Sequence, residues 1–328
     1  MSPFTRNAYL VCDSSIKDGS GHVMRSITLG LALQKIGFAV NLVCSEIPAL
    51  LQERSQSFGI GVIRRISRPE SQELGAELNR IAGINDIVIF DGYKFLQSAI
   101  TEVYHSKKVV VIIDDNGELG TFPCHVILNQ NLHSNETMYS QNSSTPILLL
   151  GLSFALIRPE IAAFKNSILV TPRKGILLSI GGTDHLGIAP LLYGALQEAI
   201  DEDVLITGGF FGKSNLTPES MASAMAHSKL GIIACGTTTW EAICLGLPFI
   251  GLIAADNQLK SATELRKHGL TDIFDIRVNF EPSKIVNRVR NSLDNYDELN
   301  LVPNSLRELV DGLGPQKVAA QIEKICVD

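Results

Sequence analysis

Short runs of β-branched and aliphatic residues alternate with amphipathic helical stretches along most of this chain. The first half reads AYLVCD, a helix that begins after Gly21, then AVNLVCS, a helix in IPALLQERSQSFG and GVIRRI. The alternation continues through SQELGAELNRIAG, DIVIFD, QSAITEVYHS, KVVVIIDD and CHVILNQN. Strands separated by helices form βαβ crossovers, which place the strands in a parallel sheet with helices on both faces. The sequence therefore predicts a doubly wound α/β domain.

The same alternation returns in the C-terminal half after a break. Residues 146–174 contain three prolines and no clear βα period, so we interpret them as the connection between two domains. A chain of 328 residues also exceeds the size at which one hydrophobic core keeps growing. We expect two Rossmann-like domains, residues 1–157 and 158–328, that face each other across a cleft and bind ligands in the loops after their strands.

Charge and composition exclude several classes of protein. The 28 basic and 34 acidic residues are interspersed and give a formal net charge of −6, so bulk charge recruits neither nucleic acid nor anionic lipid. No run of eighteen apolar residues predicts a membrane span, and no signal peptide is evident. The six cysteines are scattered without a CxxC pair, which is typical of reduced thiols. We expect a cytoplasmic protein.

Three glycine-rich turns follow predicted strands and open helices: DGSGHVMR, SIGGTDH and IACGTTTWE. Glycine lets the backbone approach a ligand, and the first amides of a helix attract an anion. None of the turns matches GxGxxG followed by an acid or GxxxxGK[ST], which disfavours dinucleotide enzymes and P-loop NTPases. We therefore expect these turns to bind a diphosphate. The candidates are Gly19, Gly21, Gly182, Thr183, Gly236, Thr237, Thr238 and Thr239.

His22 lies in the first of these turns, at the start of a helix. Glycine and serine precede it, so a packed core position is less expected here than for His227 or His268, which fall on amphipathic helices. The field at a helix N-terminus disfavours the imidazolium, and a neutral ring suits a general base near pH 7. The alternative is a histidine that only caps the helix or donates a hydrogen bond.

Glu241 follows Thr237 by about one helical turn. A carboxylate at that place can accept hydrogen bonds from both hydroxyls of a ribose. An acid near a helix start also complements the helix dipole without touching any ligand. The sequence alone leaves these two interpretations open.

Further polar residues end predicted strands and can reach a ligand. They are Asp91, Tyr93, Asp114, Asp115, Asn129, Asn131, Asp256, Asn257 and Gln258. Aspartate at such places is more often a turn or cap residue, and Asp256 in particular fits an N-cap. Asn257 is the stronger candidate for orienting water or a sugar hydroxyl.

The motifs DxSxxxGSGHVMR, FDxY, LSFALIRPE, GGTD, GTTTWEAICLGLP and ADNQ occur in this order between about Asp13 and Gly269. Together they resemble the UDP-2,4-diacetamido-2,4,6-trideoxy-β-L-altropyranose hydrolase family of pseudaminic acid biosynthesis. That family is similar to the GT-B glycosyltransferases, particularly the N-acetylglucosaminyl transferase of peptidoglycan synthesis. The resemblance implies a GT-B-like fold, a nucleotide-sugar substrate, no cofactor and no metal.

The resemblance also implies roles for individual residues. His22 falls on the general base, while Tyr93 and Asn257 fall on positions that contact the substrate. Glu241 falls on the ribose-binding acid and Thr237–Thr239 on the diphosphate loop. Asp256 and Gln258, on either side of Asn257, complete the predicted binding set.

Two departures from the family pattern bear on activity. Val11 stands where an arginine is expected, two residues before the first aspartate of the motif. Between GGTD and CGTTTWE the chain is also shorter by roughly one helix and one strand, and GGTDHLG lacks the expected asparagine. The third strand of a sheet ordered 3-2-1-4-5-6 is an edge, so a shortened second domain is expected to keep its ligand loops. We expect nucleotide binding to persist and sugar specificity to differ.

The leading hypothesis is hydrolysis of a UDP-linked acetamido-deoxy sugar, with Asn257 placing water and His22 removing its proton. One alternative is a GT-B glycosyltransferase that uses a UDP-sugar donor and an acceptor hydroxyl. A second alternative is a homologue that binds a nucleotide sugar without turning it over. Val11 and the shortened second domain are the features that favour this alternative.

Overall fold

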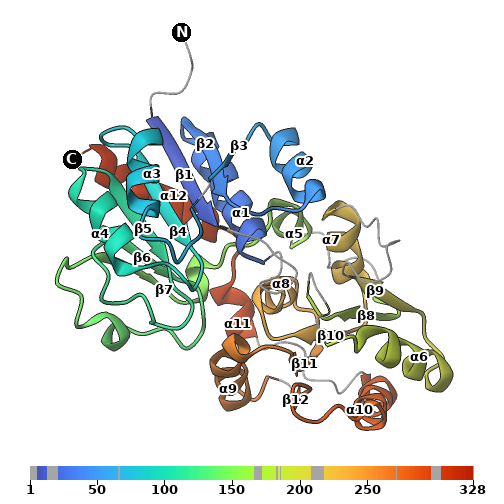
Figure 1. Cartoon of the computed structure of the whole chain (residues 1–328). Coiled ribbons are helices and arrows are strands. Elements are labelled where there is room, and N and C mark those ends of the chain that lie inside the picture. Colours follow the sequence, from blue (N-terminus) through green and yellow to red (C-terminus); the bar gives the residue numbers. More distant parts are fainter. Residues whose placement is uncertain are drawn as a thin grey trace. The chain divides into compact units, whose positions relative to one another are not determined.

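A computed structural model describes residues 6–12, 21–65, 67–165, 172–181, 184, 186–207, 218–270, 272–296 and 304–327. The chain divides into two compact units. Unit 1 comprises Met1–Leu156 and Leu313–Asp328, and unit 2 comprises Ile157–Gly312. Figure 1 shows that each unit consists of a sheet flanked by helices.

Unit 1 is built around a parallel sheet of seven strands in the order β3-β2-β1-β4-β5-β6-β7. The strands are β1 (Arg6–Cys12), β2 (Phe38–Cys44), β3 (Gly61–Arg64), β4 (Ile87–Asp91), β5 (Val109–Ile113), β6 (Val126–Asn129) and β7 (Ile147–Leu150). The chain moves outward from β1 to β3 and then returns to pair β4 with the other side of β1. This reversal between β1 and β4 is the topological switch point, where ligands bind in folds of this type.

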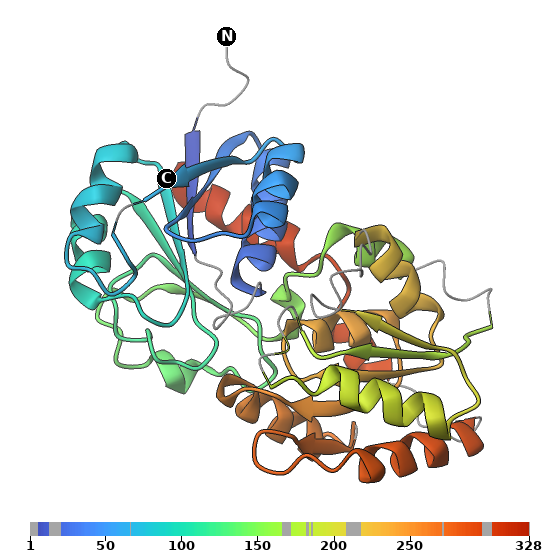
Figure 2. The same ribbon diagram turned by 45° about the vertical axis from the view of Figure 1, so that its right-hand side comes forward.

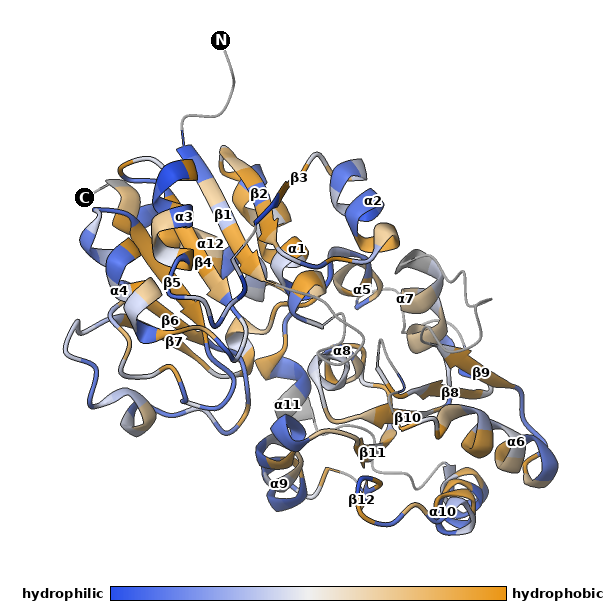
Figure 3. Ribbon diagram, in the orientation of Figure 1, coloured by the Kyte–Doolittle hydropathy of each residue, from blue (hydrophilic) through white to orange (hydrophobic). Residues whose placement is uncertain are grey.

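The side chains of β1 point alternately to the two faces of this sheet. Ala8, Leu10 and Cys12 pack with α1 (Gly21–Lys35), while Tyr9 and Val11 pack with the helices of the other face. Those helices are α3 (Leu74–Ile81) and α4 (Gln97–His105), and α2 (Ala49–Ser57) lies on the α1 face. Figure 3 shows the resulting apolar strands between helices with polar outer faces.

Val11 is fully buried in the cluster on the α3 and α4 face. An arginine at this position would place its charge among aliphatic and aromatic side chains such as Val43 and Phe90. The departure from the family pattern therefore adds a core contact at the end of β1.

Residues 313–328 belong to unit 1, although the sequence analysis assigns them to the second domain. Helix α12 (Gly314–Val327) inserts Val318, Ala319 and Ile322 into the cluster formed by β1 and α1. Figure 2 shows α12, in red, beside α1, in blue. An amphipathic helix does not reveal in its sequence which sheet it will cover, so this return of the chain is decided by tertiary packing.

Residues 146–174 also differ from the interpretation as a plain connection. Their start forms β7, the last strand of the first sheet, and a 3₁₀ turn, η2 (Leu152–Phe154), follows. The boundary between the units lies after Leu156, and α5 (Pro159–Phe164) already belongs to unit 2. A run such as ILLL has no polar alternation, so its sequence does not distinguish an edge strand from other buried structure.

Unit 2 contains a parallel sheet of five strands in the order β12-β11-β10-β8-β9. The strands are β8 (Ile176–Ser179), β9 (Val204–Thr207), β10 (Leu230–Ala234), β11 (Phe249–Ile253) and β12 (Ile273–Asp275). The helices are α5, α6 (Ala189–Ala199), α7 (Pro218–His227), α8 (Thr237–Leu245), α9 (Leu259–Lys267), α10 (Pro282–Asp294) and α11 (Asn304–Leu309). Helices α6 and α10 share a buried cluster with one face of the sheet.

The strand order of unit 2 is that of a doubly wound sheet in which the third strand is absent from the described residues. Its first and fourth strands, β8 and β10, are neighbours in the sheet. The predicted fold class of two doubly wound parallel-sheet domains, the second shortened, is thereby confirmed.

Candidate functional site

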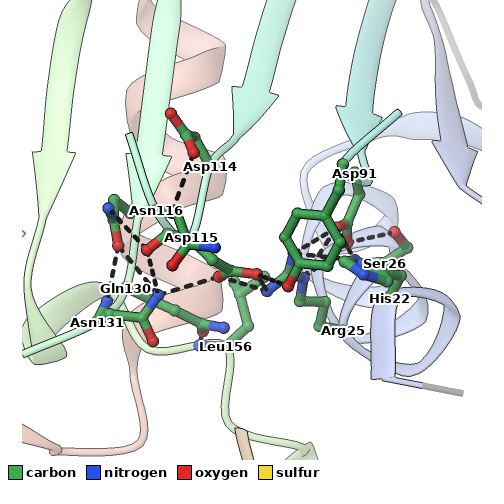
Figure 4. Close-up of polar contacts among 12 residues, drawn as sticks. His22, Arg25, Ser26, Asp91, Asp114, Asp115, Asn116, Gln130, Asn131 and Leu156 are labelled. Carbon is green, nitrogen blue, oxygen red and sulfur yellow. Dashed lines mark hydrogen bonds and ion pairs between the residues drawn. The ribbon is translucent and has the colours of Figure 1, made fainter. Parts of the chain in front are cut away.

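The carboxyl ends of β4, β5 and β6 bring a group of polar side chains to the first turns of α1. His22 and Arg25 lie three residues apart on α1 and therefore share a helix face. Asp91 ends β4, and Asp115 follows β5 by two residues. Because the strands are parallel, these ends lie at one edge of the sheet, and Figure 4 shows the four side chains in a single network.

His22 is paired with Asp91 through Nδ1, which lies 2.6 Å from Asp91 Oδ1. The Asp91 carboxylate only accepts hydrogen bonds, so this contact requires a proton on Nδ1. Nε2 of the neutral ring is then the nitrogen that carries the lone pair, and no hydrogen bond to it is found among the described residues. Arg25 Nη2 also lies 3.0 Å from Nδ1, but it is closer to Asp91 Oδ1, at 2.5 Å. We therefore assign the proton to Nδ1, on the shorter contact with Asp91, and the lone pair to Nε2.

Arg25 lies between two carboxylates and is almost fully buried. Its Nε is 2.8 Å from Asp91 Oδ2, its Nη2 is 2.5 Å from Asp91 Oδ1, and its Nη1 is 2.7 Å from Asp115 Oδ1. Burial by itself would lower the pKa of Arg25, but the charges of Asp115 and Asp91 outweigh it and raise that pKa well above its ordinary value. The guanidinium is thus a permanent charge that crosslinks two strand ends.

The pKa values of Asp91 and Asp115 are lowered, whereas that of Arg25 is raised. Burial would raise the pKa of Asp91 and of Asp115, yet the charge of Arg25 and its hydrogen bonds lower both below the ordinary range. Both carboxylates are therefore ionised at neutral pH. With one guanidinium and two carboxylates, the network carries one net negative charge beside the His22 ring.

Tyr93 completes this group from the loop after β4. Its hydroxyl donates to Asp115 Oδ2 over 2.7 Å, and its ring stands edge to face against the His22 ring at a centroid distance of 4.8 Å. Asn131 Nδ2 also donates to Asp115 Oδ1, over 3.0 Å. Tyr93 and His22, predicted as site residues, thus lie together in unit 1.

Other candidates at this edge have structural roles. Asp114 accepts the backbone N–H groups of Asn116, Gly117 and Leu119, which is the behaviour of a turn residue. Asn129 Nδ2 donates to the hydroxyl of Tyr139 over 2.8 Å. Neither side chain contacts His22 or Arg25 in the described structure.

In unit 2, the turn IACGTTTWE joins β10 to α8, as the sequence predicts. Gly236 is the N-cap residue of α8, and the half-buried Thr237 and Thr238 form its first turn. Thr239 differs, because its buried hydroxyl donates to the carbonyl of Ala234 over 3.2 Å. The hydroxyl of Thr239 therefore holds the turn together, which leaves Thr237 and Thr238 as the hydroxyl candidates.

Glu241 lies one turn further along α8 and is 6% exposed. Its carboxylate is held by the guanidinium of Arg158, with Arg158 Nε 2.6 Å from Oε1 and Nη2 2.7 Å from Oε2. Arg158 lies in the LSFALIRPE motif, and its sequence predicted no role for it. The pairing could not be predicted, because a contact between residues 83 positions apart leaves no pattern in a single sequence.

Asp256, Asn257 and Gln258 form a short 3₁₀ helix, η5 (Asp256–Gln258), after β11. Asp256 is exposed and pairs with Arg277, and Asn257 is exposed. The Gln258 side chain accepts the backbone N–H of Ala254 over 2.8 Å. A Cβ atom at Gly236 would lie 3.8 Å from Gln258 Nε2, so this turn and the start of α8 are adjacent.

Gly21 opens α1 next to His22. Three further candidates, Gly19, Gly182 and Thr183, lie outside the described residues. Across the ranges that the structure describes, His, Cys, Asp and Glu side chains form no group of three suited to a metal ion. Within the same ranges, every helix is too short or too polar to cross a bilayer.

Comparison with known proteins gives likenesses along nearly the whole chain. No protein-family model matches it. The spore coat polysaccharide biosynthesis protein SpsG of Bacillus subtilis strain 168 is 20% identical over an alignment 343 positions long, gaps included, which covers 96% of this chain and 97% of SpsG. The crystal structure of MurG from Acinetobacter baumannii has a TM-score of 0.61 at 14% identity and covers 98% of this chain and 100% of its own.

A second solved structure is UDP-GlcNAc 2-epimerase from Neisseria meningitidis bound to UDP-GlcNAc. It has a TM-score of 0.63 at 12% identity and covers 98% of this chain and 100% of its own. These structural likenesses show a fold of the GT-B type, as found in glycosyltransferases and epimerases.

Proposed function

We propose that this protein hydrolyses a UDP-linked acetamido-deoxy sugar to UDP and free sugar, as a step in polysaccharide biosynthesis. The observation that carries the proposal is the pairing of His22 Nδ1 with Asp91, which leaves Nε2 able to accept a proton. Support for the substrate class comes from a polysaccharide biosynthesis relative and from an epimerase bound to UDP-GlcNAc.

The reaction assigns one task to each group. His22 Nε2 takes a proton from water, the water oxygen bonds to the anomeric carbon, and the bond from that carbon to the diphosphate oxygen breaks. UDP leaves with the bonding electron pair. Proton uptake places a second positive charge next to Asp91 and Arg25, and this charge neutralises the net negative network that surrounds it.

The nucleotide is assigned to the start of α8. The first amides of a helix and the hydroxyls of Thr237 and Thr238 suit the negative charge that grows on the departing diphosphate. Glu241 is assigned to the ribose, and Asn257 to the water or a sugar hydroxyl. Tyr93, beside the His22 ring, is assigned to the sugar.

Incubation of the protein with a panel of UDP-sugars tests this proposal. We expect UDP and free sugar to appear in equal amounts without any added alcohol, as followed by ³¹P and ¹H NMR. In ¹⁸O-labelled water the label should enter the anomeric hydroxyl of the sugar, because the carbon–oxygen bond breaks.

Four results would contradict this proposal. Label in UDP would show that water attacks phosphorus and not the anomeric carbon, and a glycoside formed only with an added alcohol would show a transferase. A UDP-sugar epimer would indicate an epimerase, and tight UDP binding without any turnover would indicate an inactive binding protein.

A further inference from the structure

The contact between Arg158 and Glu241 is a bidentate, side-on salt bridge, in which the forked guanidinium faces the forked carboxylate. Two parallel N–H groups, Nε and Nη2, donate to the two carboxylate oxygens over 2.6 and 2.7 Å. The side chains are 17% and 8% exposed, so water has little access to either partner. Such charge-assisted bidentate pairs fix orientation as well as supplying energy.

Both residues project from backbone that is itself fixed. Arg158 precedes Pro159, which restricts the residue before it to extended conformations, and Arg158 has φ −57° and ψ 140°. Its carbonyl accepts the N–H groups of Ile161 and Ala162 and so begins α5. Glu241 belongs to α8, where Trp240 and Ala242 on either side are buried. The fork therefore holds the carboxylate of Glu241 in one plane.

Arg158 does not use all the acceptor positions of the Glu241 carboxylate. A carboxylate has about four lone-pair positions, and Arg158 takes one on each oxygen. One position remains on each oxygen, which is the number that a vicinal diol needs. Burial would lower the pKa of Arg158, but the charge of Glu241 outweighs burial and raises it, so the guanidinium stays charged.

We propose that Arg158 is a positioning residue that holds Glu241 to accept both hydroxyls of the ribose, so that the site selects a ribonucleotide over its 2′-deoxy counterpart. The inference rests on the proposed function, because it assumes that Glu241 meets the nucleotide. Arg158 itself donates to no ligand in this assignment; it acts through the carboxylate.

Titration calorimetry of the whole chain with UDP and with 2′-deoxy-UDP tests the inference. Loss of one hydrogen bond to a charged acceptor should make the wild-type protein bind 2′-deoxy-UDP about 10- to 100-fold more weakly than UDP. In Arg158→Gln that ratio should fall to about threefold or less, because UDP loses the well-placed bonds of both hydroxyls whereas 2′-deoxy-UDP loses only that of the 3′-hydroxyl. Arg158→Lys retains the charge without the fork and should give an intermediate ratio.

Arg288→Gln is a matched control. Arg288 also pairs with a carboxylate in unit 2, that of Asp272, but both side chains are about half exposed. This variant should keep the wild-type ratio. Arg158→Lys also serves if Arg158→Gln does not fold, because it leaves no buried carboxylate without a positive partner.

The outcomes separate the two proposals. A wild-type preference for UDP that persists in Arg158→Gln and Arg158→Lys would overturn the role of Arg158 and leave the proposed function standing. A wild-type protein that turns over UDP-sugars but binds both nucleotides equally would also overturn it. A protein that binds neither nucleotide would overturn the inference together with the proposed function.

Discussion

Replacement of His22 by alanine is expected to lower the turnover of a UDP-sugar by about 10²- to 10⁴-fold. The variant loses the group that takes the proton of water, while Asp91 and Arg25 still pair with each other. The affinity for UDP should change little, because the residues assigned to the nucleotide belong to unit 2. The measurements are kcat for UDP release and the Kd of UDP by calorimetry.

Two further results make this test specific. Imidazole added to His22→Ala should restore part of the turnover, since a free base can enter the space that the ring leaves. His268→Ala is the control, because His268 is exposed on unit 2 and bonds through Nδ1 to the carbonyl of Glu264. Unchanged turnover in His22→Ala would falsify the role of His22 as the base.

The position of His22 could be predicted from its sequence, but its partners could only partly be predicted. A histidine at the start of a helix after a strand belongs to the edge of the sheet where ligands bind, and Asp91 and Tyr93 follow a neighbouring strand. From the sequence, the helix terminus was the one predicted influence on the ring. The structure adds the carboxylate of Asp91 at 2.6 Å from Nδ1, from which we assign the tautomer.

Arg25 carried a readable signal that the sequence analysis did not use. Its spacing of three from His22 places both on one face of α1, and two acids at strand ends have to find positive partners when they are buried. The pair of Arg158 and Glu241 offered no such signal. It joins the residue that precedes α5 to a residue within α8, and nothing in either local sequence specifies the other.

The fold could be predicted where apolar strands alternate regularly with amphipathic helices along the sequence, and less well elsewhere. Strands with flanking turn signals, such as β1 and β4, were predicted because a continuous apolar run between helices suits a central parallel strand. The edge strand β7 and the return of α12 to unit 1 were not predicted. Both depend on which surface remains uncovered once the rest of the sheet has formed.

Replacement of Arg25 by methionine is expected to lower the free energy of unfolding by about 3–5 kcal/mol at pH 7. Methionine replaces the unbranched stem of arginine to about the position of Nε, but Asp91 and Asp115 are then left buried without their guanidinium. Urea unfolding of the wild type and the variant measures this loss. Arg64→Met is the control, because Arg64 is exposed on unit 1 and donates to Gln52 in an exposed contact, and it should cost less than about 1 kcal/mol.

The free energy of unfolding lost in Arg25→Met should be smaller at acidic pH than at pH 7. Both aspartates have lowered pKa values in the folded protein, so their stabilisation is fully present above the ordinary carboxylate pKa of about 3.9 and is lost as the pH falls through the lowered values. In Arg25→Met, burial without the guanidinium favours the protonated carboxyl, so the penalty eases on acidification. The difference between wild type and variant should therefore narrow from pH 7 to pH 4.

A combined variant separates charge from packing. Arg25→Met together with Asp91→Asn and Asp115→Asn removes the positive charge and both negative charges, so most of the lost stability at pH 7 should return. If it returns, the cost of Arg25→Met is the cost of uncompensated carboxylates. If the combined variant is no more stable than Arg25→Met, or if the loss is the same at pH 4 and pH 7, the guanidinium acts through its packing and not through its charge.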